Sequence, residues 1–389
     1  MNIYHDFKMP ENVRFGVGAH ESLPNEIRRF SARKIGLISD KGLEKAGVVQ
    51  KIESLLEPLS LPIATFTDIQ GEPSFSLLGN TIDYFKQEEC DVIIGIGGGS
   101  AMDVAKTTAA LLLVDDYSEY LSGAKVIEKR GVPSILLPTT SGTGAEVTMN
   151  AIFGDEVLEV KRGLVSPALL PTVAIVDPLL TISCPPRVTA ASGVDAFTHA
   201  IESYIAVKAT PLTKIYAEKA MKLFPNYITK AVHHGSDLGG RVGMSWVSHL
   251  AGVTLANAGV GAVHALSYPL GGKYHIEHGV ANALLMPYVF NIIGKTCTTE
   301  MVEIADFLGI GDYRNRQFEA LGAVVNYLYQ LLHDLDLPTS LQELGIEEQD
   351  LPLLAGEASK IDRLLSNTPY KLTEQKILGI YQKAFKGEI

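Results

Sequence analysis

A carboxylate and an imidazole stand four residues apart in the segment GVDAFTHAIESY, residues 193–204. The apolar spacing of this segment predicts a helix, and residues i and i+4 are neighbours on a helix surface. Asp195 and His199 can therefore point at one small object, and a metal ion is the obvious candidate. A hydrogen-bonded pair on a solvated helix face is the simpler alternative, because polar pairs are common there.

Two further histidines, in the segment 259–285, favour the metal. His264 and His278 lie fourteen residues apart and complete a set of three imidazoles and one carboxylate. Nitrogen and oxygen ligands without a thiolate suit Fe(II), Zn(II) or a similar divalent ion. His275 precedes His278 by three residues and is a competing ligand. A lone histidine in an apolar segment is more often a core residue, but four such groups are less easily explained in that way.

A glycine-rich segment, GIGGGSAMDVAK at 95–106, follows a predicted strand and opens a predicted helix. Three successive glycines let the backbone approach a ligand closely, and the N–H groups that begin a helix favour an anion such as phosphate. A tight structural turn is the alternative, since the segment is neither a G-x-G-x-x-G motif nor a Walker A loop. Asp103 and Lys106 on the first helical turns strengthen the case, and ordinary helix-end charges are the alternative explanation for them.

A second polar loop, LPTTSGTGAEVT at 137–148, also follows a predicted strand. Its Thr139, Thr140 and Thr143 supply hydroxyl groups where open α/β sheets bind ligands. Local capping hydrogen bonds are the alternative explanation.

Asp40 ends the predicted strand at 34–39. A carboxylate in this place can accept hydrogen bonds from an adenosine ribose and repel a 2′-phosphate, which favours NAD over NADP. Its alternative role is the N-cap of the helix that follows.

The segments that position these residues are of two kinds. The first half alternates β-rich runs with amphipathic stretches, which predicts an open parallel sheet. We expect strands at 34–39, 61–69, 91–97 and 133–140, and helices at 42–59, 74–89 and 102–114. From residue 186 onward, apolar residues recur at three- and four-residue spacing, which predicts an all-helical domain. The expected domains are 1–185 (α/β) and 186–389 (all-α).

The composition of the chain excludes several classes of partner. A chain of 389 residues is long enough for two domains. The net charge of −11, without clustered Lys or Arg, argues against nucleic acid as a partner. Three scattered cysteines suit a reducing cytoplasm, and no signal peptide is evident. The longest apolar runs are well short of the ~20 residues that a membrane-spanning helix needs, so no membrane partner is expected.

Four segments together resemble the iron-containing (group III) alcohol dehydrogenases: GGGSAMDVAK, PTTSGTGAE, GVDAFTHAIESY and GAVHALSYPLGGKYHIEHGVANALLMP. They occur in the family's order, and the similarity covers nearly the whole chain. The resemblance implies an NAD-binding α/β domain and a helical metal-binding, catalytic domain, the architecture shared with dehydroquinate synthase. It implies NAD(H)-dependent interconversion of an alcohol and an aldehyde or ketone, with Fe2+ as the first choice of metal and Zn2+ as the second.

The resemblance also assigns residues, position by position. The implied metal ligands are Asp195, His199, His264 and His278. The implied cofactor residues are Gly97, Gly98, Gly99, Ser100, Thr139, Thr140, Thr143, Lys161 and Leu180. The residue patterns described above add Asp40 and Asp103 to this set.

Two positions depart from the family's pattern. Tyr268 stands where many members carry a further histidine, and Glu277 stands where many carry proline. Tyr268 either relays the substrate proton, helped by His275, or only shapes the substrate pocket, and we favour pocket shaping because a bound metal does most of the work on the alcohol's acidity.

Two other functions compete with the dehydrogenase. A cyclising lyase of the dehydroquinate synthase type would use the same fold, NAD and a metal, whereas a non-catalytic binding protein would show no turnover. For the dehydrogenase, we expect a small-molecule alcohol or carbonyl substrate, a cytoplasmic location, and a homodimer or higher homo-oligomer.

Overall fold

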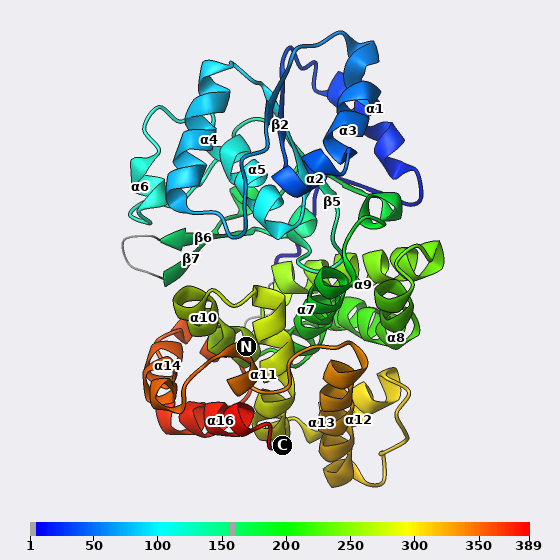
Figure 1. The fold of residues 1–389 in the computed structure, drawn as a ribbon, viewed down its shortest axis with the longest axis vertical. Helices are drawn as coiled ribbons and strands as arrows, with labels where there is room; N and C mark the ends of the chain where they lie inside the picture. The colour runs from blue at the N-terminus through cyan, green and yellow to red at the C-terminus, as the bar shows by residue number, and fades with distance from the viewer. Residues whose placement is uncertain (1–4, 156–159) are drawn as a thin grey trace. The chain divides into compact units, whose positions relative to one another are not determined.

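The computed structural model describes residues 5–155 and 160–389 of the chain. These residues form two compact units, Met1–Cys184 and Pro185–Ile389. Figure 1 labels many of the elements of both units.

The first unit is built on a parallel sheet. Its six described strands lie in the order β1-β8-β5-β4-β2-β3, and every neighbouring pair is parallel. The strands are β1 (Asn12–Phe15), β2 (Ile35–Ile38), β3 (Ile63–Phe66), β4 (Val92–Gly97), β5 (Ser134–Pro138) and β8 (Val173–Val176). The predicted open parallel sheet is therefore confirmed.

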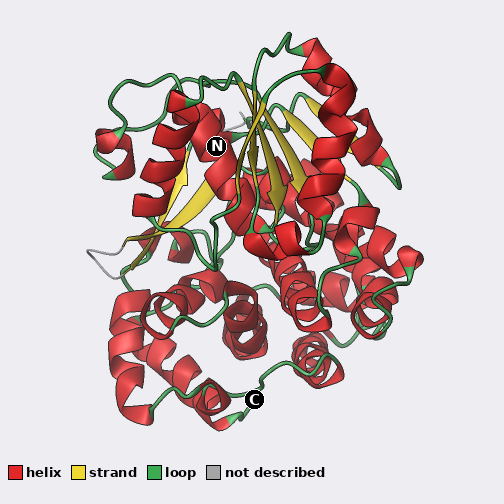
Figure 2. Ribbon diagram, turned by 45° about the horizontal axis from the view of Figure 1, so that its top comes forward, coloured by secondary structure: helices red, strands yellow, loops and turns green. Residues whose placement is uncertain are grey.

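Helices cover both faces of this sheet (Figure 2). Alternate residues of β4 enter different cores: Val92 and Ile94 pack with α1 and α3, whereas Ile93 packs with α4 and α5. Burial on both faces explains why the β4 sequence is a nearly continuous apolar run. The helices of this unit are α1 (Leu23–Arg29), α2 (Lys41–Lys45), α3 (Val48–Leu56), α4 (Phe75–Gln87), α5 (Gly99–Leu111) and α6 (Ser118–Leu121).

Two features of this unit differ from the prediction. The helix expected at 42–59 is interrupted at Gly47, whose φ of +77° is left-handed and separates α2 from α3. An antiparallel pair, β6 (Asn150–Asp155) with β7 (Val160–Val165), was not predicted. Charged residues and glycines interrupt its apolar alternation, so the pattern is weak, and residues 156–159 between the strands lie outside the described residues.

In the second unit the described regular structure is helical, as predicted. Its α-helices are α7 (Pro186–Ile205), α8 (Pro211–His233), α9 (Leu238–Ala258), α10 (Ala262–Tyr274), α11 (His278–Ile293), α12 (Thr298–Phe307), α13 (Gln317–Asp334), α14 (Leu351–Ala358), α15 (Asp362–Leu365) and α16 (Glu374–Lys386). Within the described parts of the chain, no single helix is both long and apolar enough to cross a membrane, and only the bent pair α9 and α10 meets that criterion by length and composition.

Candidate functional site

Helix α7 carries the first two metal candidates inside the helical unit. Every residue from 193 to 205 is buried, because α7 is packed on all sides by its neighbours. Asp195 and His199 are only 2% and 3% exposed. His199 Nε2 lies 3.8 Å from Asp195 Oδ2, which is too long for a hydrogen bond. The alternative of a hydrogen-bonded pair on a solvated face is therefore wrong.

Two other helices bring the remaining ligand candidates to Asp195. His264 lies on the first turns of α10, and His278 is the first residue of α11. Their Nε2 atoms lie 3.8 Å and 3.9 Å from Asp195 Oδ1. One ligand atom from each of the four residues lies within 4.8 Å of the others, so helices α7, α10 and α11 build one His/Asp metal site.

The donor set fits a divalent ion. Two atoms that are each about 2.1 Å from a common ion are at most about 4.2 Å apart, and the separations from Asp195 to its neighbours agree with this limit. The buried Nε2 of His264 has no hydrogen-bond partner among the described residues, an arrangement that is costly unless a ligand is bound there. Burial opposes ionisation of Asp195, but the three imidazoles and the Asn282 amide outweigh it and hold the pKa of its carboxyl below the ordinary value.

Sequence reasoning missed two buried residues that touch the ligands. Glu202 accepts a hydrogen bond from His264 Nδ1 at 2.6 Å. Asn282 Nδ2 donates to Asp195 Oδ1 at 2.7 Å and lies 3.1 Å from His278 Nε2. Spacing alone was a usable signal, because Glu202 is three residues after His199 and Asn282 is four after His278, on the same helix faces.

The structure places Tyr268 and His275 differently. Tyr268 is half-buried one helical turn after His264, and its ring centroid is 6.1 Å from that of His278. His275 is exposed, ends α10 with a left-handed φ of 55°, and is not a member of the metal cluster. Glu277 is also exposed, and its Oε1 pairs with Arg187 at 3.1 Å.

The predicted cofactor loops meet at the carboxyl ends of two inner strands of the parallel sheet in the first unit. They follow β4 and β5, which are neighbours, and the Thr139 N–H donates to the Gly97 carbonyl at 2.9 Å. A methyl group added at Gly99 would lie 2.8 Å from Thr143 Cγ2, so only glycine fits against the threonine loop. Predicted residues in these loops are Gly97, Gly98, Gly99, Ser100, Thr139, Thr140 and Thr143.

Asp40 lies at the end of β2, the neighbour of β4 on its other side. Its Oδ1 accepts from the Leu43 N–H at 2.9 Å, so Asp40 is the N-cap of α2. Its Oδ2 faces the glycine loop, because a methyl group at Gly97 would lie 3.4 Å from that oxygen. The helix cap uses only Oδ1 of Asp40, so Oδ2 is still available for a ribose. Ribose binding by Asp40 stays a prediction.

The remaining cofactor candidates contact other parts of the first unit. Asp103 pairs with the buried Lys106 at 2.9 Å and accepts from the Ile152 N–H at 2.9 Å, so both of its oxygens are engaged. Lys161 pairs with Glu72 at 2.8 Å. Leu180 is buried in the apolar core.

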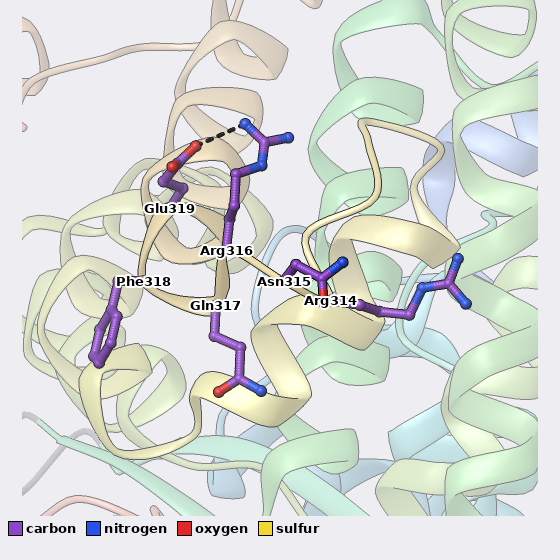
Figure 3. Close-up of a pocket in the computed structure, with 6 residues that line it drawn as sticks. All are labelled: Arg314, Asn315, Arg316, Gln317, Phe318 and Glu319. Carbon is purple, nitrogen blue, oxygen red and sulfur yellow. Dashed lines mark hydrogen bonds and ion pairs between the residues drawn. The ribbon is translucent and has the colours of Figure 1, made fainter.

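A surface hollow at the start of α13 contains none of these residues. It is lined by Arg314, Asn315, Arg316, Gln317, Phe318 and Glu319 (Figure 3). Arg316 is paired with Glu319, and the Phe318 side chain is 92% exposed.

Comparison with known proteins identifies the family. Residues 10–178 match the family model described as iron-containing alcohol dehydrogenase, and residues 189–385 match the C-terminal model of the Fe-containing alcohol dehydrogenase family. The chain belongs to the iron-containing alcohol dehydrogenase family. This alcohol dehydrogenase is 41% identical to Long-chain-alcohol dehydrogenase 1 of Geobacillus thermodenitrificans, over 98% of this chain and 96% of that protein.

Solved structures agree with this alcohol dehydrogenase in fold. A crystal structure of 1,3-propanediol oxidoreductase matches with a TM-score of 0.93 and 33% identity, covering 98% of this chain and 100% of that one. Sulfoacetaldehyde reductase from Bifidobacterium kashiwanohense, solved in complex with NAD+, matches with a TM-score of 0.89 and 27% identity over 98% and 99% of the two chains. The family confirms an oxidoreductase acting on alcohols and disfavours the cyclising lyase.

Proposed function

We propose that this alcohol dehydrogenase transfers hydride between a small-molecule alcohol and NAD+, and in reverse between NADH and an aldehyde or ketone. The observation that carries the proposal is the cluster of Asp195, His199, His264 and His278, of which the first three are buried and His278 is partly exposed. A bound divalent ion would supply Lewis acidity to the substrate oxygen, and bound NAD would accept the hydride.

Residues of the helical unit have two tasks around the ion. Asp195 would supply one negative charge, and the three imidazoles, which come from α7, α10 and α11, would supply neutral donors. Asp195, His199 and His264 are buried, which limits their rotamer freedom, so these donors are oriented before a substrate arrives. His278 is partly exposed and leaves one side of the cluster open to a substrate. Iron is our first choice of ion because of the family, and zinc is the second, because this donor set does not separate them.

The loops of the α/β unit would hold the cofactor. We expect the first-turn N–H groups of α5 and residues Gly97 to Ser100 to bind the pyrophosphate, because Gly98 provides no side-chain cap for the helix. Thr139, Thr140 and Thr143 offer hydroxyl groups beside that loop. Asp40 would bind the adenosine ribose through its second oxygen.

Tyr268 is expected to shape the substrate pocket rather than to act as the base. Its half-buried ring lies beside His278, and an unperturbed tyrosine, with a pKa of about 10, is a poor base near neutral pH. The alternative, in which Tyr268 relays the proton with the help of His275, has less support because His275 is exposed and lies outside the cluster.

Location and assembly complete the proposal. We expect the enzyme in the cytoplasm, because its three cysteines are scattered along the sequence and two of them, Cys90 and Cys297, are buried. We also expect a homodimer or a higher homo-oligomer.

The test is an activity assay on the purified protein with NAD and a panel of alcohols, followed by NADH absorbance. The metal is then removed with a chelator, and Fe2+ or Zn2+ is added back separately. We expect NADH formation that the chelator abolishes and one of the ions restores. Failure of every alcohol in the metal-loaded protein would contradict the proposal.

A further inference from the structure

The carboxylate of Glu202 lies one turn beyond His199 on α7 and is 2% exposed, yet it is not one of the four clustered ligands. Its Oε1 accepts from the Val263 N–H at 2.7 Å, and its Oε2 lies 2.6 Å from His264 Nδ1. A buried carboxylate is tolerated only when its oxygens have partners. Here both partners belong to consecutive residues at the start of α10.

Glu202 first replaces a missing helix cap. Helix α10 begins at Ala262, and its N-cap residue, Gly261, offers no side-chain hydrogen bond. The Val263 N–H belongs to the first turn, where backbone donors have no acceptor within the helix. Glu202 accepts this hydrogen, and its negative charge suits a helix N-terminus. The carboxylate therefore fixes the first turn of α10, which carries His264, against α7.

The same carboxylate determines where the proton of His264 resides. An ionised carboxylate can only accept, so the hydrogen between Glu202 and His264 belongs to Nδ1. A neutral imidazole with its proton on Nδ1 has its lone pair on Nε2. That atom lies 3.8 Å from Asp195 Oδ1, inside the cluster, and has no hydrogen-bond partner among the residues described.

We propose that Glu202 is a positioning residue, which fixes the tautomer and the ring orientation of His264 so that the Nε2 lone pair faces the metal. This inference rests on the proposed function, because it requires that the cluster binds an ion. Partners of this kind typically contribute a factor of about 10 to 100 to metal affinity.

Glu202→Gln tests the role with nearly the same side-chain shape. The amide replaces one acceptor oxygen by an NH2 group, which must face either the Val263 N–H or the His264 ring. If the NH2 group faces the His264 ring, it donates to Nδ1, and the imidazole proton then moves to Nε2. Nε2 then has no lone pair for a metal. We expect the Kd for Fe2+ or Zn2+, measured by competition with a chelator, to rise about 10- to 100-fold.

Glu303→Gln is the matched control. Glu303 accepts a hydrogen bond from the Tyr204 hydroxyl at 2.7 Å and therefore also binds to α7, but it touches no ligand. We expect its metal Kd to equal that of the wild type. A purely structural role for Glu202 would lower the melting temperature of the metal-free variant while leaving its metal Kd unchanged, and that result would overturn the inference.

A second measurement needs no folded Glu202 variant. NMR of the metal-free wild type with isotopically labelled histidine nitrogens reports the tautomer of His264, with the signal assigned by its loss in His264→Asn. We expect the proton of the neutral ring on Nδ1, and a proton on Nε2 would overturn the inference. A wild type that binds no divalent ion would instead refute the proposed function, so the two failures are distinguishable.

Discussion

Asn282 donates a hydrogen bond from Nδ2 to Asp195 Oδ1 at 2.7 Å, although the two residues are 87 positions apart in the chain. The bond links the first turns of α11 to α7, and it leaves the second oxygen of Asp195 directed at His199. The only carboxylate of the ligand cluster is thus held in place by a neutral amide that adds no charge to the site.

Asn282→Ala should therefore weaken metal binding. Without the amide, Asp195 loses its orienting bond, and we expect the metal Kd to rise by about 10- to 100-fold. The measurement is a chelator competition on the purified variant. Asn226→Ala is a control on α8, because the exposed Asn226 amide donates to the backbone carbonyl of Lys222, four residues earlier, and is not part of the metal cluster. Equal Kd values for the two variants would contradict the role assigned to Asn282.

Asp40→Asn should raise the use of NADP relative to NAD. Asparagine keeps an oxygen that can cap α2, so it removes the charge that would repel a 2′-phosphate while preserving the helix start. The measurement is the ratio of kcat/KM for the two cofactors. Asp40→Gly should change that ratio in the same direction. An unchanged ratio in both variants would mean that Asp40 serves only as a helix cap.

Tyr268→Phe should retain most of kcat if the ring only shapes the pocket. Tyr268→Ala should instead alter substrate preference and KM, because it removes the ring beside His278. Steady-state kinetics on several alcohols distinguish the two roles. A loss of kcat beyond about 100-fold in Tyr268→Phe, which is the scale of lost general acid–base catalysis, would show that the hydroxyl relays the proton.

Lys106→Met should destabilise the α/β unit. Lys106 is buried and also donates to the Ala145 carbonyl, so its removal leaves Asp103 without its cation. Removing one partner of such a pair costs about 3–5 kcal/mol, because the other charge stays buried. Asp103→Asn removes that charge and keeps an oxygen that can accept from the Ile152 N–H. Urea unfolding followed by far-UV circular dichroism should therefore rank Lys106→Met below the double variant Asp103→Asn/Lys106→Met. Equal losses in the two proteins would contradict this account.

The sequence was informative where residue type and local spacing carry the signal. The buried run of β4 and the i, i+4 pair of Asp195 and His199 are such cases. The interruption at Gly47 was not foreseen, because an amphipathic pattern continues on both sides of a single left-handed residue.

Local sequence patterns could not predict contacts between segments that are distant in the chain. Burial of α7 on all sides depends on its packing against other helices, and it decides that Asp195 is a buried charge rather than a surface one. The hydrogen bond from the Ile152 N–H to Asp103 is another such contact, because the two residues are 49 positions apart in the chain. Spacing places a residue on a helix face, whereas only tertiary structure shows what that face meets.

His264→Ala provides the most direct test of the metal-dependent mechanism. The variant and the wild type are purified side by side, and bound metal per chain is measured together with NADH formation from an alcohol. His233→Ala is the control, because His233 is exposed at the end of α8. We predict that His264→Ala loses most of its metal and its activity while the control keeps both. Full metal content with full activity in His264→Ala would contradict the assignment of the site.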